Sequence, residues 1–406
     1  MESPASYEDP AWRILPSGHQ FADDEAVMRY AIEIAGRGEG FVEPNPMVGA
    51  VIVDRDRRLV SCGYHQKFGQ AHAEVNAIAA ATGCCRNAVL FVTLEPCSHH
   101  GKTPPCADAV IAEGFSRVVV GCQDPAPHVA GRGLAKIREA GIDVVVGVCE
   151  PESQRLIAPF RMLYSQHRPW VHAKWAMTLD GRIAAASGHS KWISSEESRT
   201  RVHRLRGRMD AIITGAGTVR ADNPELTARP PGPRQPIRVI LDSSGNNVRI
   251  DSQLVRTLDK APVLVCVRQD ACVSTDMSAG FRSLVDAGVE VLPLPAAQAD
   301  HDSDSSALRG LSLEALLAEL GRRGCTNVLI EAGSRVLGSF FDRGLIDEVH
   351  AFVAPKLVGG QNAPGALGGR GLSQIPQQPD LTNVIWQISG CDIYCRGDVS
   401  RNEQSS

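Results

Sequence analysis

The hydrophobic pattern of the first 150 residues alternates between two periods. Apolar positions three and four residues apart predict helices, and short β-branched runs predict strands. A helix is expected where Asp23 and Asp24 open the run DDEAVMRYAIEIAGRG, which closes on glycines. A hairpin is expected over residues 44–64, where two apolar runs flank a charged turn. Further strands are expected over residues 88–94, 117–124 and 142–148, alternating with helices over residues 72–83, 106–114 and 131–141. This order predicts a layered α/β domain.

The pattern resumes after Pro169 and predicts a second α/β domain. Residues 151–168 are expected to form a helix that leads to this proline. Strands are expected over residues 170–181, 211–217, 237–244, 261–267, 289–294, 327–333 and 348–359. The predicted organisation is therefore a loose tail over residues 1–20, a first domain over 21–150, a linker helix over 151–168 and a second domain over 169–400.

Composition and charge narrow the class of protein. A chain of 406 residues, with 43% hydrophobic and 22% charged residues, suits two globular domains. The net charge of -4, with basic residues spread along the chain, argues against a broad nucleic-acid surface. We find no apolar run near the roughly 18 residues that a membrane span needs. The acidic N-terminal stretch does not resemble a secretory signal, so a cytoplasmic protein with no membrane or nucleic-acid partner is expected.

The twelve cysteines are expected to stay reduced in the cytosol. Cysteines inside apolar runs such as VLVCV and VVVGC are predicted to be small buried hydrophobes. Two others invite a different interpretation. Cys97 and Cys106 lie in TLEPCSHHGKTPPC, which follows a predicted strand, and His72 opens the predicted helix HAEVNA upstream. One imidazole and two thiolates are typical ligands of a catalytic zinc, which keeps a fourth position for water.

Glu74 adds a general acid–base to this pattern. It lies two residues after His72, and a carboxylate there can take a proton from water and pass it to a leaving amine. His-x-Glu followed by Pro-Cys and a second cysteine is typical of zinc nucleobase deaminases. In the common form two residues separate the cysteines, whereas here eight do. The residues alone leave open a disulfide, two buried thiols, and a structural zinc with His99 or His100 as fourth ligand.

The combined string HAEVNA…TLEPCSHHGKTPPC resembles the deaminase half of the bifunctional riboflavin-biosynthesis deaminase/reductase family, in which the longer cysteine gap is the rule. The resemblance continues through PNPMVGAVIV and QDPAPHVAGRGL. It implies a three-layer cytidine-deaminase-like fold, with His72, Cys97 and Cys106 as zinc ligands and Glu74 as the catalytic acid–base. It also implies that Asn45 contacts the substrate, and it assigns the loop between the cysteines to the substrate. His65, His99 and Lys102 are further candidates for contacts with a phosphate and ribose.

In the second domain, the residues by themselves indicate little. A strand feeds a small-residue turn and a helix in VLIEAGSRVLGSFFDRG, and the backbone N–H groups at such a helix start can hold a phosphate. The segments KWAMTLDGRIA, SGHSKWIS, GAGTVRADNPELTAR, IEAGSRVLGSF and VAPKLVGG resemble, in order, the reductase half of the same family. This resemblance implies a dihydrofolate-reductase-like α/β fold that uses NADPH.

Carried over position by position, the resemblance predicts two sets of contacts in this half. The cofactor contacts are Ala176, Trp192, Thr218, Asp222, Ser243, Gly333, Ser334, Arg335, Val336, Leu337, Gly338 and Ser339. The substrate contacts are Ser190, Arg206, Leu226, Arg229 and Glu331. Lys174 is a further candidate near the ribose.

The predicted function is two consecutive steps of riboflavin synthesis on a small pyrimidine ribosyl phosphate. A zinc-dependent hydrolytic deamination comes first, and NADPH then reduces the ribosyl group to ribityl. The family resemblance also implies a homo-oligomer, a dimer or a tetramer. Two alternatives stay open at this stage: a cytidine or tRNA-adenosine deaminase with an RNA-binding appendage, which the net charge disfavours, and a non-catalytic zinc scaffold, which the presence of Glu74 disfavours.

Overall fold

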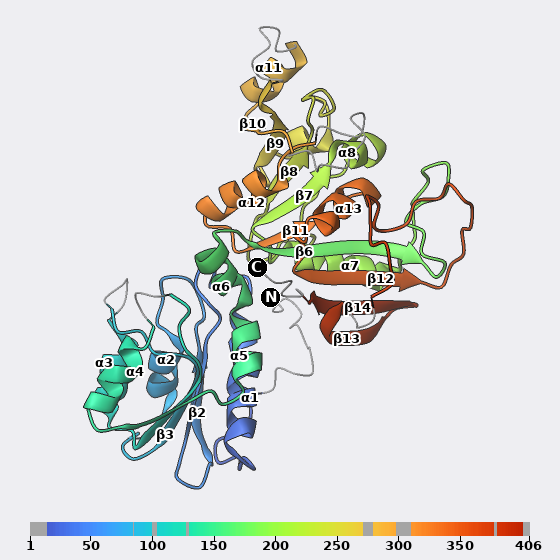
Figure 1. The fold of residues 1–406 in the computed structure, drawn as a ribbon. Helices are drawn as coiled ribbons and strands as arrows, with labels where there is room; N and C mark the ends of the chain where they lie inside the picture. The colour runs from blue at the N-terminus through green and yellow to red at the C-terminus, as the bar shows by residue number, and fades with distance from the viewer. Residues whose placement is uncertain are drawn as a thin grey trace, which may run out of the picture. The chain divides into compact units, whose positions relative to one another are not determined.

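The chain forms two compact units, residues 1–167 and residues 168–406, in the computed structural model (Figure 1). The structure describes residues 14–83, 85–99, 104–126, 130–270, 279–297, 310–376 and 380–400. None of the helices in these ranges combines the length and the apolar character that crossing a membrane requires. Each unit is built on its own mixed sheet.

The first unit has a five-stranded sheet in the order β2-β1-β3-β4-β5. Strands β1 and β2 form the predicted antiparallel hairpin, β1 also pairs with β3 antiparallel, and β3, β4 and β5 are parallel. The strand bounds are β1 Gly49–Val53, β2 Leu59–Tyr64, β3 Val89–Leu94, β4 Arg117–Cys122 and β5 Asp143–Val146. Every strand expected in this unit is present.

Helices cover both faces of this sheet, which gives three layers. Helix α1 (Asp24–Ala35) packs on one face, where it meets Val51 of β1, while Ile52 belongs to the core of the opposite face. That opposite face is covered by α2 (Ala73–Ala80), α3 (Cys106–Glu113) and α4 (Arg132–Glu139). The Asp23 side chain caps α1 by accepting a hydrogen bond from the Ala26 N–H, so the predicted helix start is confirmed. A short 3₁₀ turn, Gly36–Gly38, follows α1.

Two features of this unit follow from local composition. The predicted single helix over residues 151–168 is wrong: the structure has α5 (Glu150–Leu156) and α6 (Ala158–Gln166). Pro159 has no N–H to donate, so it stands in the first turn of a new helix rather than inside a continuous one.

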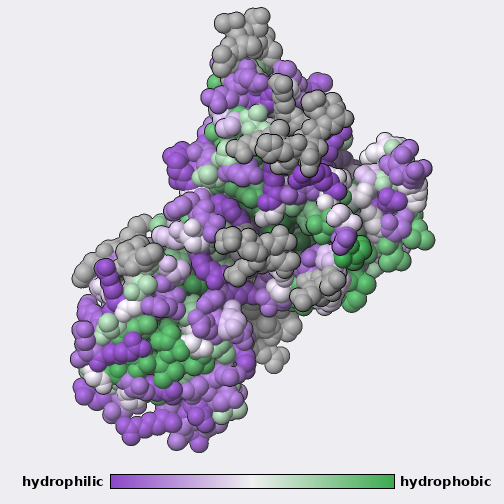
Figure 2. Space-filling model, viewed as in Figure 1, coloured by the Kyte–Doolittle hydropathy of each residue, from purple (hydrophilic) through white to green (hydrophobic). Residues whose placement is uncertain are grey.

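Helix α2 is rich in alanine, so its solvent side stays apolar, and an apolar area lies at its position on the face shown in Figure 2.

The second unit has a nine-stranded sheet in the order β10-β9-β8-β7-β11-β6-β12-β14-β13. Neighbours are parallel from β10 to β12, and the pairs β12/β14 and β14/β13 are antiparallel. The bounds are β6 Trp170–Thr178, β7 Ala211–Gly215, β8 Ile237–Leu241, β9 Val263–Arg268, β10 Glu290–Leu294, β11 Asn327–Ile330, β12 Glu348–Ala354, β13 Leu381–Ser389 and β14 Asp392–Val399.

The parallel part of this sheet is covered on both faces. On β11, Val328 and Ile330 belong to one core, to which α12 and α13 contribute, and Leu329 belongs to the other, to which α8, α9 and α11 contribute. Helix α7 adds Val202 to a smaller cluster with Phe352 and Tyr394. The helix bounds are α7 Glu196–Arg206, α8 Ala216–Asp222, α9 Gln253–Arg256, α11 Ala279–Asp286, α12 Leu313–Arg322 and α13 Ser334–Asp342.

The hairpin of β13 and β14 was not predicted. Strand β13 lies at the edge of the sheet, and most of its residues are exposed, so its sequence lacks the apolar alternation of a half-buried strand. The signal that was available is the Ser389–Gly390 turn between two runs rich in β-branched and aromatic residues.

Candidate active sites

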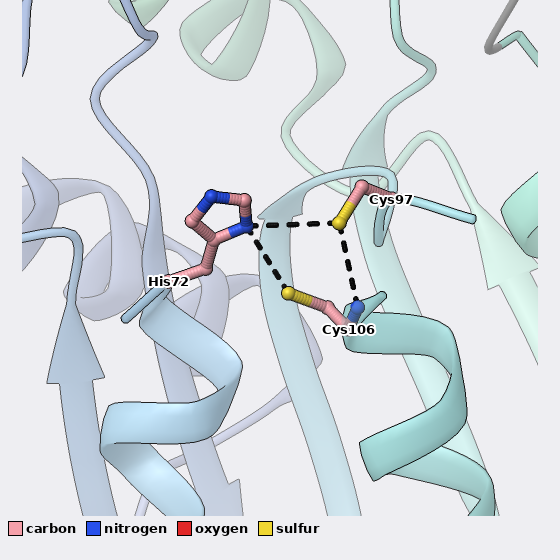
Figure 3. Close-up of side chains that lie close together, drawn as sticks. All are labelled: His72, Cys97 and Cys106. Atoms are coloured by element: carbon pink, nitrogen blue, oxygen red, sulfur yellow. Dashed lines mark hydrogen bonds between the residues drawn. The ribbon is translucent and has the colours of Figure 1, made fainter. Parts of the chain in front are cut away.

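Three predicted metal ligands meet at the carboxyl end of β3 in the first unit (Figure 3). His72 is the N-cap of α2, Cys106 is the first residue of α3, and Cys97 lies in the segment after β3. The His72 Nδ1 atom lies 3.2 Å from the Cys106 sulfur and 3.7 Å from the Cys97 sulfur. The Cys106 backbone N–H also donates to the Cys97 sulfur, at 3.3 Å. The sequence separated these residues by up to 34 positions, and the fold brings their ligand atoms together.

The electrostatics of this group favour a thiolate. A hydrogen bond from the Cys106 thiol lowers the pKa of Cys97 to about 4, against the opposing effect of burial and with further help from His72. The same hydrogen bond, together with burial, raises the pKa of Cys106. One imidazole nitrogen and two sulfurs within this distance are donors that suit zinc, and three protein donors leave a position for water. The residues present therefore fit a catalytic zinc.

Glu74 is buried next to the metal-ligand group, with 3% of its surface exposed. Burial raises the pKa of its carboxyl to about 7, and a hydrogen bond between Glu74 and Cys106 places it against the group. A carboxyl with a pKa near neutrality can both accept and return a proton. This is the property that the sequence pattern assigned to Glu74.

A cavity opens from the metal-ligand group, and the predicted substrate contacts Asn45, His65 and His99 line it together with His72 and Glu74. The Asn45 amide lies 3.4 Å from His65 Nε2, and His65 Nδ1 lies 3.1 Å from the Ala71 carbonyl oxygen. Burial lowers the pKa of His65, which favours the neutral ring. Lys102, the remaining predicted contact in this domain, lies outside the described residues. The cavity walls also include Asp124, and Phe68, Gln70, Phe160 and Tyr164, four residues that were not among the predicted site residues.

Glu95 also lines the cavity and organises its rim. Its buried carboxylate accepts hydrogen bonds from four backbone N–H groups, those of Asp124, Gly131, Gly133 and Leu134. It therefore ties the start of α4 and the loop before it to the turn that carries Cys97. The available signal was its place in the Leu-Glu-Pro-Cys run, but its partners are backbone groups more than 28 residues away, which no side-chain motif marks.

In the second unit, the predicted substrate contacts Arg206 and Glu331 form a buried bidentate ion pair. Arg206 donates from Nε and Nη2 to the two oxygens of Glu331, at 2.6 and 2.7 Å, and from Nη1 to the Thr227 carbonyl oxygen at 3.2 Å. The Lys174 Nζ atom lies 4.0 Å from the same carboxylate. Burial opposes ionisation of Glu331, but Arg206 outweighs it and the pKa of Glu331 falls to about 2. Burial lowers the pKa of Lys174. The result is a compact group of charges beside β6 and β11.

The predicted cofactor contacts follow the carboxyl ends of three neighbouring strands. Thr218 and Asp222 belong to α8, directly after β7, and Ser243 follows β8. Gly333 is the N-cap of α13, just after β11, with Ser334, Arg335 and Val336 behind it. In open α/β sheets, ligands bind beyond the carboxyl ends of the strands, and a helix start offers N–H groups to a phosphate. The structure therefore gathers these segments at one edge of the sheet.

The loop between β6 and α7 approaches the same region. The Lys191 ammonium lies 3.6 Å from Asp222, which brings the predicted contacts Ser190 and Trp192 toward α8. Trp192 is 65% exposed, and the Arg199 guanidinium lies over its ring at 4.7 Å. An exposed aromatic surface of this kind is available to a ligand. Ala176, the remaining predicted cofactor contact on β6, is half-buried.

Five further predicted contacts differ in exposure or surroundings. Leu226 is buried and has a left-handed backbone, with φ +56°, and Arg229, three residues later, is exposed. Leu337 has no exposed surface and packs in the core, so it presents no surface to a ligand in this structure. Gly338 is also buried, while Ser339 bonds the Arg335 carbonyl oxygen within α13.

Comparisons with known proteins agree with this division of the chain. The family described as "RibD C-terminal domain" matches residues 169–395. The family described as "Cytidine and deoxycytidylate deaminase zinc-binding region" matches residues 22–122. The riboflavin biosynthesis protein RibD of Actinobacillus pleuropneumoniae is 40% identical over 366 residues, covering 90% of this chain and 93% of the relative. That of Escherichia coli is 38% identical over 371 residues, covering 88% and 94%.

The chain belongs to the RibD family. It is accordingly a bifunctional deaminase and reductase of riboflavin biosynthesis. Among solved structures, a deaminase/reductase from Thermotoga maritima superposes with a TM-score of 0.75 at 36% identity, covering 93% of this chain and 98% of that one. Acinetobacter baumannii RibD gives the same TM-score and identity and covers 93% and 99%. The predicted family resemblance and fold class are confirmed. The alternative of an RNA-binding appendage is wrong, because residues 169–395 match the RibD C-terminal domain, the reductase domain of this family.

Proposed function

We propose that the first unit carries out the hydrolytic deamination of 2,5-diamino-6-(5-phosphoribosylamino)pyrimidin-4(3H)-one. The observation that carries this proposal is the position of buried Glu74 beside three metal-ligand atoms on the wall of a cavity. Zinc held by His72, Cys97 and Cys106 would act as a Lewis acid that lowers the pKa of water. Glu74 would hold the proton taken from that water and return it to the amine that leaves as ammonia.

We propose that the second unit reduces the ribosyl group of the deaminated product to ribityl, giving 5-amino-6-(5-phosphoribitylamino)uracil. NADPH would supply the hydride. The support for its place is the set of strand ends and the start of α13 that carry the predicted cofactor contacts. Arg206, Glu331 and Lys174 would orient the sugar, because their charged groups are buried and already fixed by one another.

Removing a metal ligand tests the division of labour. In Cys97→Ser, ammonia release from the diamino substrate is expected to fall to background, because a hydroxyl is a poor replacement for a thiolate on zinc. Oxidation of NADPH with the deaminated substrate is expected to continue at the wild-type rate. Ammonia release is measured by a coupled enzymatic assay, and Cys62→Ser is the control, since Cys62 is half-buried and is not among the cavity-lining residues. Undiminished ammonia release in Cys97→Ser would contradict the proposed site.

The contact between α4 and the Cys97 turn provides a second test. A Cβ atom on Gly133 would lie 1.9 Å from the Pro96 carbonyl oxygen, so alanine must push α4 away from that turn. Overpacking of this kind costs about 1–3 kcal/mol of stability, and displacing a catalytic group by roughly 1 Å can cost about 100-fold in rate. We expect Gly133→Ala to lower ammonia release by about that factor and to leave the reductase unchanged. Gly83→Ala, where a Cβ meets nothing within 4 Å, is the control.

We also propose that the chain acts as a homo-oligomer. Edge strand β13 supports this, because Trp386 and Ile388 are 65% and 75% exposed and the strand contains no lysine or proline that would discourage pairing with another strand. Sedimentation of the wild type should give a multiple of the 43.5 kDa chain mass. Ile388→Glu should shift the protein toward the monomer, while Asp143→Asn on edge strand β5 of the other unit should not. A monomeric wild type would contradict this proposal.

A further inference from the structure

A second group of metal-ligating side chains lies in the sheet of the second unit. His172 is on β6, and Glu348 and His350 are on the neighbouring strand β12. Glu348 is paired with His172 in register, and His350 is two residues further along, so all three side chains are on one face of the sheet. Their side chains are 8%, 5% and 5% exposed. Neither the deaminase nor the reductase function proposed above uses them.

Two imidazole nitrogens and the two oxygens of one carboxylate face one another at the spacing of metal ligands. His172 Nδ1 lies 3.2 Å from His350 Nε2 and 3.5 Å from Glu348 Oε2, and His350 Nε2 lies 3.2 Å from Glu348 Oε1. Zinc bonds to histidine nitrogen and carboxylate oxygen are about 2.0–2.2 Å long, so the ligand atoms of a tetrahedron lie roughly 3.3–3.6 Å apart. A central ion would therefore bind the two imidazole nitrogens and the Glu348 carboxylate with little movement of the side chains.

All three side chains also have hydrogen-bond partners outside the group. His172 Nε2 lies 3.1 Å from the Asn327 side-chain oxygen, and His350 Nδ1 lies 2.8 Å from the Tyr394 hydroxyl. Glu348 accepts a hydrogen bond from Trp170 Nε1 at 3.2 Å through Oε2, which also faces His172, and is paired with Arg396 through Oε1, which also faces His350. Partners of this kind orient the ligands of known metal sites, since a ligating histidine binds a second group through its other nitrogen and a ligating carboxylate is itself hydrogen-bonded.

The hydrogen bond of His172 to Asn327 also determines which of its ring nitrogens carries the proton, and so what it presents to the other two side chains. The Asn327 oxygen can only accept, so His172 must donate to it from Nε2, and a neutral His172 then presents a bare Nδ1 lone pair to the group. Nε2 of His350 faces that lone pair at 3.2 Å. Either a proton of His350 or a cation must lie between the two nitrogens, and the Glu348 carboxylate, which also pairs with Arg396, faces this position.

We propose that His172, Glu348 and His350 form a second metal site of this chain, for a divalent transition metal of the zinc type. Two imidazoles and one carboxylate suit zinc and cobalt, and the absence of sulfur separates this site chemically from the one in the first unit. Its role is structural, because the metal would bridge β6 and β12, the pair of strands that continues from His172 to the reductase residues Lys174 and Ala176.

Cobalt provides the test, because a cobalt–thiolate bond gives an intense charge-transfer absorption that a site of nitrogen and oxygen donors lacks. The full-length double variant with Cys97→Ser and Cys106→Ser is produced in cobalt-supplemented medium, desalted, and analysed for metal by mass spectrometry. We expect about one cobalt ion per chain without the sulfur band, compared with about two in the wild type. A double variant that is folded by circular dichroism and holds less than about a tenth of an ion would overturn the proposal.

Further variants locate the ion in the double-variant background. His350→Gln is expected to remove it, while His189→Gln, at an exposed histidine of the same unit, is expected to retain it. Tyr394→Phe removes only the outer hydrogen bond and is expected to weaken cobalt binding by about 10- to 100-fold. This last result separates a metal site from a purely hydrogen-bonded network, whose loss of one bond would not change a metal affinity. Unchanged cobalt content in His350→Gln would place the ion elsewhere and reject the assignment.

Discussion

Glu74→Gln is expected to abolish deamination while zinc stays bound. Glutamine keeps the size of the side chain and its place beside Cys106, but it cannot take a proton from water or return one to the leaving amine. General acid–base groups contribute about 10²- to 10⁴-fold to a rate, so ammonia release should fall by at least the lower factor. The zinc content of the purified variant should equal that of the wild type, because none of the three ligands changes.

The second activity is the internal control for this variant. NADPH oxidation with the deaminated substrate should proceed at the wild-type rate in Glu74→Gln, since Glu74 belongs to the other unit. Glu139→Gln, at an exposed glutamate of the same unit, should leave both activities unchanged. If Glu74→Gln lowered the two activities equally, the separation into two independent sites would be wrong.

Glu331→Gln is expected to have the largest effect on the reductase. The neutral amide cannot balance Arg206 and Lys174, whose charged groups surround the Glu331 carboxylate in a buried position. Removing one partner of a buried pair costs about 3–5 kcal/mol, so the second unit should unfold at lower denaturant concentration. NADPH oxidation should fall by two orders of magnitude or more, because the fixed geometry around the sugar is lost.

A matched exposed pair separates this effect from a general loss of charge. Arg249 donates to both oxygens of Asp251 in the same unit, but both side chains are at the surface, so Asp251→Asn should change neither stability nor activity measurably.

The stability that the Glu331 carboxylate contributes depends on pH with a definite sign. The folded-state pKa of Glu331 is about 2, below the unfolded value of roughly 4.3. Its contribution to the free energy of unfolding is therefore present above roughly pH 4.3 and is lost as the pH falls toward 2. Glu331→Gln should lack that part of the acid sensitivity.

Local pattern predicted much of the fold, because most strands are buried on both faces or pair inside a sheet. Strands β3 and β4, for example, consist mostly of apolar residues and are buried on both faces, so a continuous apolar run in the sequence marks each of them. The exposed strand β13 follows no such pattern, and it was missed. The break between α5 and α6 was missed as well, although Pro159 marked it.

The candidate sites also include one group that the sequence predicted and others that it did not. His72, Glu74 and the two cysteines form a motif whose chemistry is readable from residue types, so the metal-ligand group could be predicted before its geometry was known. The ion pair of Arg206 with Glu331 joins residues 125 positions apart, and although both were predicted as substrate contacts, their pairing with each other was not. The buried group of His172, Glu348 and His350 is similar, since residues 176 positions apart meet only when β6 pairs with β12. Pairing of this kind depends on tertiary structure, which no local spacing encodes.

The most direct test of the two-step account follows the absorbance of reduced cofactor after the protein is mixed with the diaminopyrimidine ribosyl phosphate and NADPH. If the two sites act in series, oxidation begins after a lag, the deaminated substrate removes the lag, and Cys97→Ser oxidises NADPH only with the deaminated substrate. Oxidation by Cys97→Ser of NADPH with the diamino substrate, or no oxidation by the wild type with either substrate, would contradict action in series.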